Sequence, residues 1–333
     1  MVGALPSAEF RSREMRAADI PRCARILAEK CPYEGYESAA VNQSWPRLLE
    51  AGRMKAAVAQ GGQGTIIAFG ASVFLTSQFA RRLLSNPTPF IGRQITESAF
   101  TAPPPICTVD EIAKSNANSG LSVFILHSGV SEVHGRTEQF DIKAQLMSAF
   151  LQLHRGYRVS NVLVEAYGPE EQLLYKESSF RLVDDYSSFR DWNSLPGKPG
   201  APRPSLFGLF RNEVIRMTTH PLLPLFVYHH PRCGFNANEQ HLLREALKGH
   251  TDEELAVQLN LSLSAIKKRW IKIFEKAESC LPDAMSPGGL LRDAHVRGVQ
   301  RRHMLLRELR ARPEELTPYP RQKATQHGHP SYV

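Results

Sequence analysis

The chain has 333 residues, of which 42% are hydrophobic and 22% charged, and its formal net charge at pH 7 is +8. This length suits two domains with hydrophobic cores and a small third piece. No apolar run reaches the ~18 residues of a membrane-spanning helix and the N-terminus has no apolar signal core, which argues against membrane insertion and secretion. The five cysteines lie scattered without CxxC spacing, so we expect reduced thiols in a cytoplasmic protein, with neither a disulfide framework nor a metal site.

The first part of the chain alternates expected strands and helices. Residues 9–15 alternate in strand fashion and lead to a helix that begins at Ile20, with Asp19 as the expected cap. A helix near residues 45–51 follows. Residues 54–59 and 65–75 are expected to pair as strands across a glycine-rich turn. Residues 76–119 contain several prolines, and we expect an irregular insertion there.

A second run of expected elements follows. Residues 121–127 form a buried strand, residues 140–155 a helix and residues 160–166 another strand, which implies parallel neighbours joined by a helix. A short helix over 170–177 and a final strand over 180–186 complete this part. Residues 191–203 are rich in Pro and Gly and mark an expected domain boundary, after which the apolar residues 206–228 are expected to form a connecting helix or strand that packs on one of the domains.

This order of elements, with the opening run 13–20 and the closing run 174–180, resembles the GNAT acetyltransferase fold over most of residues 9–190. The resemblance implies an acetyl-CoA site in the loop after the fourth strand, where the family has a Gln/Arg-x-x-Gly-x-Gly/Ala motif whose backbone amides approach the pyrophosphate. Here the loop, residues 127–136, has a different spacing and contains the acidic Glu132. The departure predicts a weakened or lost cofactor site.

Other positions bear on the same resemblance. Gly168 stands where the family has Asn, and Ser179 replaces a glycine. Tyr175 matches the tyrosine that protonates the departing thiolate in such enzymes; the alternative is a helix tyrosine that packs beside the following Phe180. Arg136 and Lys143 are the cations available near the loop for an anionic ligand.

Residues 235–277 predict three helices separated by short turns. The first ends at Gly249, which tolerates left-handed backbone geometry. The second begins at Thr251, which forms a capping box with Glu254. The third begins after a short turn, with Ser262 as its N-cap. Two helices joined by such a turn have the spacing of a helix-turn-helix.

The third helix, residues 263–276, divides into two faces. The core face consists of Ile266, Trp270, Ile273 and Ala277. Most of the remaining positions are polar or basic, as a helix in the major groove requires, although a solvated charged face is the alternative. Residues 231–333 hold 17 Lys or Arg against 12 Asp or Glu, so much of the basic excess lies in this part of the chain.

The segment resembles the DNA-binding domain of the LuxR/FixJ/GerE class of bacterial regulators over about 45 residues. The matching positions are Glu239, Leu243, Gly249, Thr251, Glu254–Ala256, Leu259, Leu261–Ser262, Ala265–Lys267 and Ile273. The resemblance implies contacts to double-stranded DNA, and Ile271 stands at a position that frequently contacts bases. The expected DNA-binding residues are Ser264, Lys267, Lys268, Arg269, Ile271 and Lys272.

From residue 281 on, the chain continues past the end of a minimal DNA-binding domain of this class. Apolar residues after a Pro-Gly-Gly break predict one or two more amphipathic helices, and Pro313–Leu316 begins a last turn. These helices are expected to form a dimer interface, to add a phosphate contact or to pack on the DNA-binding domain of the same chain. We keep all three alternatives.

The fold class expected from these patterns is an α+β multidomain chain, with a GNAT-like α/β domain (1–190), a linker (191–230), an all-α helix-turn-helix domain (231–280) and a helical extension (281–333). The expected function is a homodimeric transcriptional regulator whose N-terminal domain senses an unknown small-molecule ligand or mediates dimerisation. This interpretation needs no catalytic residue and no cofactor. The alternative is an active N-acyltransferase that uses acetyl-CoA or another acyl-CoA and is fused to a DNA-binding domain. A third hypothesis is that the helix-turn-helix domain contacts a protein such as RNA polymerase.

Overall fold

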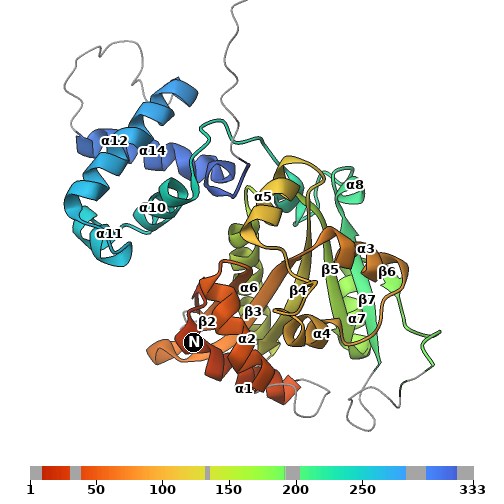
Figure 1. Ribbon diagram of the computed structural model, residues 1–333. Helices are drawn as coiled ribbons and strands as arrows, with labels where there is room; N and C mark the ends of the chain where they lie inside the picture. Colours follow the sequence, from red (N-terminus) through yellow and green to blue (C-terminus); the bar gives the residue numbers. More distant parts are fainter. Residues whose placement is uncertain are drawn as a thin grey trace, which may run out of the picture. The chain divides into compact units, whose positions relative to one another are not determined.

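The computed structural model describes residues 10–30, 39–131, 136–190, 192, 203–282 and 298–320. The chain divides into two compact units (Figure 1), the first made of Met1–Ile112 and Ser119–Val227 and the second of Ala113–Asn118 and Tyr228–Val333. The first unit is mixed α/β, and the described elements of the second unit are helical. The expected mixed α/β class is therefore confirmed for the N-terminal part.

Within the described residues, the first unit is built on one seven-stranded sheet with the strand order β1-β2-β3-β4-β5-β7-β6. All neighbouring strands are antiparallel except β4 and β5, which run parallel. Since a parallel pair needs a crossover, the long helix α6 connects these two strands. The strands are β1 (Arg11–Glu14), β2 (Met54–Gln60), β3 (Ile66–Leu75), β4 (Leu121–Val130), β5 (Val159–Tyr167), β6 (Arg181–Asp184) and β7 (Pro204–Phe210).

Helices bury both faces of this sheet. One hydrophobic cluster joins the sheet to α1 (Ile20–Lys30), α2 (Ala39–Glu50), α3 (Ser77–Ser85) and α4 (Ile91–Glu97). Two other clusters join it to α5 (Val109–Ala117), α6 (Arg136–His154), α7 (Gly168–Glu177), α8 (Arg211–Val214) and α9 (Leu223–Phe226). The central strands are therefore covered on both sides, which explains their nearly continuous apolar sequences.

One expectation about this unit is wrong and another is only partly met. Residues 76–119 are not irregular, because they contain α3, α4 and α5. The segment 191–230 is not only a linker, because Pro204–Phe210 forms β7 and lies between β5 and β6 in the sheet. A short apolar run has no periodicity that separates a buried strand from a buried helix, so the sequence left this segment unassigned.

Asp19, the expected cap of α1, has partners in the preceding turn. It closes the short 3-10 helix Ala17–Asp19 (η1), where its carboxylate accepts a hydrogen bond from the backbone N–H of Arg16 at 2.7 Å. The same carboxylate pairs with the guanidinium of Arg13 at 2.6 and 2.8 Å. This hydrogen-bonded partner is the main reason that the pKa of Asp19 is lowered. Asp19 therefore fixes the end of β1 to the following turn.

The second unit contains α10 (Ala237–Leu247), α11 (Asp252–Gln258), α12 (Leu263–Cys280), α14 (Gly298–Ala311) and the 3-10 helix η4 (Pro313–Leu316). The predicted start and stop signals are confirmed. Thr251 and Glu254 form the capping box, the Ser262 hydroxyl accepts the Ala265 N–H at 3.2 Å, and Gly249 has a left-handed φ of 96°. Ile266, Trp270, Ile273 and Ala277 are all buried in one cluster. The inward face of the third helix was thus predicted correctly.

The helix α14 packs on the core of its own unit. Leu305, Leu306 and Leu309 are buried in the same cluster as α10 and α12. The Arg302 guanidinium donates to the Asp252 carboxylate at 2.7 Å and lies 4.9 Å from the centre of the Trp270 ring. The packing alternative for the C-terminal extension is confirmed for these residues. The apolar residues expected to form a helix at 290–294 lie outside the described residues.

The cysteine expectation needs a correction. Cys233, just before α10, is bonded to Cys280 at the end of α12, with 5.1 Å between their Cα atoms. The two residues are 47 positions apart in the sequence, and only the packing of the helices brings them together. Cys23 and Cys107 are free and buried, and burial raises the pKa of each thiol to about 12.

Candidate functional site

The parallel strands β4 and β5 separate before they end. Their ladder runs from the pair Leu121–Val159 to the pair Ile125–Val164 and goes no further. Beyond that point β4 pairs only with β3, and β5 pairs only with β7. The register of β3 against β4 shifts at Leu126, which marks a bulge at the point of separation. Bulges redirect strands and are common beside active sites.

The first turn of α4 connects the two diverging strands. The carboxylate of Glu165, on β5, accepts the backbone N–H of Phe90 at 2.8 Å and that of Ile91 at 2.7 Å. Gly92, next in the helix, lies so close to β4 that a Cβ there would be 2.9 Å from the Leu126 carbonyl oxygen and 2.9 Å from His127 Cε1. Phe90 has a left-handed backbone with φ of 65°, a conformation that costs energy in a bulky residue and often accompanies function.

Glu165 is buried and has four hydrogen-bond donors around it. Besides the two backbone groups, the hydroxyls of Tyr167 and Tyr186 each donate to its carboxylate at 2.9 Å. Burial raises the pKa of Glu165 to about 7, against the opposing effect of these hydrogen bonds. A carboxyl group with this pKa exchanges a proton near neutral pH, which is the property required of a general acid or base.

His127 lies on the neighbouring strand, beside the same turn of α4. Its ring stacks on Trp45 with 6.1 Å between ring centres. Burial lowers its pKa to about 3, so the imidazole is neutral at physiological pH. Glu165 and His127 therefore lie on either side of the point where the parallel strands part, and of the two only Glu165 exchanges a proton near neutral pH.

Tyr175 packs as the structural alternative predicted. Its ring lies 5.1 Å from that of Phe180 and 6.0 Å from that of Phe207, measured between centres. Burial raises the pKa of its hydroxyl, so the group stays protonated. Ser179, which stands where the resembled family has glycine, has a left-handed φ of 62°. The turn into β6 thus keeps a glycine-like backbone without glycine.

The loop that the resemblance identifies as the cofactor loop is described only at its two ends. β4 runs to Val130, Ser131 is buried, and α6 begins at Arg136. Glu132 lies outside the described residues. Lys143 is exposed on α6.

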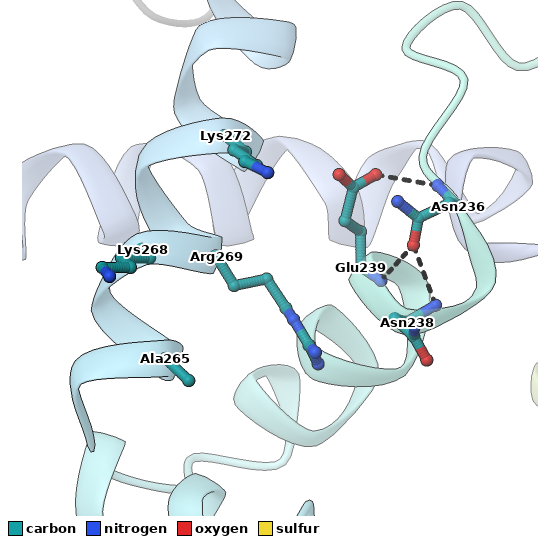
Figure 2. Close-up of a pocket in the computed structure, with 7 residues that line it drawn as sticks. All are labelled: Asn236, Asn238, Glu239, Ala265, Lys268, Arg269 and Lys272. Carbon is teal, nitrogen blue, oxygen red and sulfur yellow. Dashed lines mark hydrogen bonds between the residues drawn. The ribbon is translucent and has the colours of Figure 1, made fainter. Parts of the chain in front are cut away.

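The expected DNA-binding residues of α12 fall on two adjacent stripes. Lys268, Arg269 and Lys272 line a groove of about 320 Å³ against the start of α10, whereas the other three lie outside it. Figure 2 shows the Arg269 and Lys272 side chains directed toward α10, with Lys268 at the outer edge. The outer stripe, which is exposed, consists of Ser264, Lys267 and Ile271.

Sequence analysis missed Glu165 and the two asparagines of the groove, Asn236 and Asn238. A signal existed for Glu165, because it is the one charged residue in the apolar run of β5, and a buried charge requires partners. No comparable signal marked the asparagines, since asparagine at a helix start is usually only a cap.

No family model and no curated protein matches this chain. Solved structures that resemble it include NAA60 from Arabidopsis thaliana in complex with acetyl-CoA, at 19% identity and a TM-score of 0.39 over 61% of this chain and 99% of that one. Another is the spermidine/spermine N-acetyltransferase SpeG from Vibrio cholerae, at 10% identity and a TM-score of 0.38 over 63% and 98%. A third is FeeM, an N-acyl amino acid synthase from uncultured soil microbes, at 12% identity and a TM-score of 0.37 over 66% and 99%. We base no activity on similarity at this level.

No described helix is long and apolar enough to cross a membrane. In the described ranges, no group of three His, Cys, Asp or Glu side chains is arranged to hold a metal ion.

Proposed function

We propose that the first unit transfers an acyl group from an acyl-CoA to an amine, and that the second unit binds double-stranded DNA. The observation that carries the first part is Glu165, a buried carboxyl with a pKa of about 7 at the separation of β4 and β5. The proposal favours an active N-acyltransferase fused to a DNA-binding domain over a transcriptional regulator without enzymatic activity.

The chemistry requires a proton acceptor. As the amine nitrogen attacks the thioester carbonyl, it must lose a proton; a C–N bond forms, the C–S bond breaks, and the thiolate takes up a proton. Glu165 accepts the proton from the amine. Tyr175 remains the candidate acid for the thiolate, because its raised pKa keeps it protonated.

The backbone at the separation suits an extended thioester. Beyond Ile125 and Val164, the edges of β4 and β5 that face each other form no ladder. The pantetheine arm of coenzyme A is a narrow chain with two amide groups, and an extended chain of this kind pairs with a strand edge. Acetyl-CoA or another acyl-CoA would lie there, against the first turn of α4.

Isothermal titration with acetyl-CoA, followed by an assay of thiol release, tests this part. The assay supplies a primary amine of three classes in turn, an amino acid, a polyamine and a peptide with a free N-terminus. Glu165→Gln should lower the rate by about 10²-fold or more, because it removes the base. Glu97→Gln, on the exposed end of α4, is the matched control. Absence of acetyl-CoA binding by the parent protein removes the proposal.

A second candidate function uses the same units differently. If acetyl-CoA binds but no amine is acylated, the first unit is a sensor, and the chain is a regulator of transcription. The observation that favours DNA binding is the α12 surface, where Lys267, Lys268 and Lys272 are exposed while Trp270 faces inward. Lys267→Ala and Lys268→Ala should weaken duplex binding and reduce its salt dependence. Parental binding by both variants would contradict the assignment of α12.

The remaining partners are proposals of the same kind. A homodimer would match the two-fold symmetry of most operators, and sedimentation of the full chain with and without duplex tests it. Contact with RNA polymerase is tested by co-purification from cells after nuclease treatment. Cytoplasmic localisation is tested by fractionation.

A further inference from the structure

The groove between α10 and α12 is formed by residues that are distant in the sequence. Asn236, Asn238 and Glu239 come from the start of α10, and Ala265, Lys268, Arg269 and Lys272 come from α12. The four α12 residues recur at spacings of three, one and three and so form one stripe of the helix. The groove lies entirely within the second unit (Figure 2).

The groove is strongly positive. Three of its lining residues are cations, and no partner of opposite charge is found for them among the described residues. The single carboxylate, Glu239, is already engaged. It accepts the backbone N–H of Asn236 at 2.8 Å and the ammonium of Lys276 at 2.6 Å. Since Lys276 offsets this carboxylate, the charges of Lys268, Arg269 and Lys272 act on whatever enters.

The wall opposite the cations is polar and held in place. The side-chain oxygen of Asn236 accepts the N–H groups of Asn238 and Glu239, each at 3.0 Å. These bonds cap α10 and fix the direction of the Asn236 amide. The cations give the groove the chemistry of an oxyanion site, because arginine presents two parallel N–H groups and lysine a point charge.

We infer that this groove binds a phosphate group, held mainly by Arg269 and Lys272 with Lys268 at its edge. Within the proposed function, on which this inference rests, the group is a backbone phosphate of duplex DNA. The stripe formed by Ser264, Lys267 and Ile271 lies beside the groove on α12. A phosphate in the groove therefore sets the rotation of α12 about its axis and directs this stripe toward the base edges, because phosphate contacts fix register while base contacts specify sequence.

The test uses the full chain and a mixed-sequence duplex of about 30 base pairs, with affinity measured by fluorescence anisotropy over a salt series. Arg269→Gln and Lys272→Gln should each reduce the slope of log affinity against log salt by about 0.9, the value for one lost phosphate contact. Arg310→Gln removes the same charge from an exposed position on α14 and should leave the slope near that of the parent. Lys272 is exposed, so its variant remains informative if Arg269→Gln alters folding.

A second arm separates the source of the phosphate. Inorganic phosphate is titrated into the ¹⁵N-labelled chain, and the amide signals of Asn236 and Asn238 are followed in the parent and in the Lys272→Gln variant. A reduced duplex slope in both groove variants supports a DNA phosphate, with or without shifts of these amides. If phosphate shifts these amides, Lys272→Gln abolishes the shifts and the parent does not bind the duplex, the result supports a small phosphate ligand. The DNA part of the proposed function then fails.

The inference is overturned if the groove variants keep the parental slope and inorganic phosphate moves neither amide. If Lys267→Ala still reduces the slope in that case, DNA binding stands and only the groove assignment fails. If the parent binds neither duplex nor phosphate, both the inference and the DNA function fail.

Discussion

Replacing Glu165 with glutamine keeps the size of the side chain and removes its ability to ionise. In the parent, the folded state holds this proton more tightly than the unfolded chain does, because burial raises the pKa of Glu165 from 4.5 to about 7. A raised carboxyl pKa stabilises the fold fully below the unfolded value and loses that stabilisation as pH rises through the folded value. We therefore expect the parent to lose stability between pH 4.5 and pH 7 through this group.

The size of the effect follows from the same two pKa values. A difference between 4.5 and about 7 corresponds to about 3 kcal/mol in the free energy of unfolding. The glutamine variant has no such dependence. The stability of the parent relative to the variant should then fall by about 3 kcal/mol as pH rises across this range.

Urea unfolding at a series of pH values measures this difference. The fluorescence of Trp45, buried in the same unit, reports the transition in a background where Trp270 of the other unit is replaced by phenylalanine. Glu97→Gln, which changes the carboxyl paired with Arg93 on the surface of α4, is the control for other titrating groups. A difference between parent and Glu165→Gln that stays constant from pH 4.5 to pH 7 would refute a raised pKa, and with it the role of Glu165 as base.

Three further predictions concern stability. Gly92→Ala should cost about 1–3 kcal/mol because its Cβ would contact the Leu126 carbonyl; Gly70→Ala, where a Cβ meets nothing within 4 Å, is the control in the same thermal unfolding assay. Cys280→Ser should destabilise the second unit by up to about 4 kcal/mol, the chain-entropy value for the loop that the disulfide closes. Urea unfolding followed by Trp270 fluorescence measures this loss. The pairing would be contradicted if the variant were as stable as the parent and reductant did not change the stability of the parent. Thr251→Ala should cost about 1 kcal/mol through loss of the N-cap, and an unchanged urea midpoint would contradict the cap's contribution.

Much of the second unit was predictable because its signals are local. A cap such as Thr251 acts on an N–H three residues away, and the buried stripe of α12 repeats with the period of the helix. The sequence alone therefore defined where α10 ends, where α11 and α12 begin and which face of α12 lies inward. It also defined the cations that face outward, but not which of them meet α10.

The first unit shows what only the tertiary structure decides. β7 lies between β5 and β6, although it follows β6 in the chain and was expected only as a connecting helix or strand. Strand pairing joins residues distant in sequence, so no local pattern reports it. The same holds for the disulfide between Cys233 and Cys280, whose partners meet only after the helices pack.

The candidate sites follow the same division. The sequence determined the chemical types present, a lone carboxyl in an apolar strand and a basic helix face. The tertiary structure decided that Phe90, Glu165 and Tyr186 meet where β4 and β5 part, and that Asn236 lies across a groove from Lys272. The physical reason is range: propensity, capping and periodicity act within a few residues, whereas a site depends on which surfaces are buried against each other.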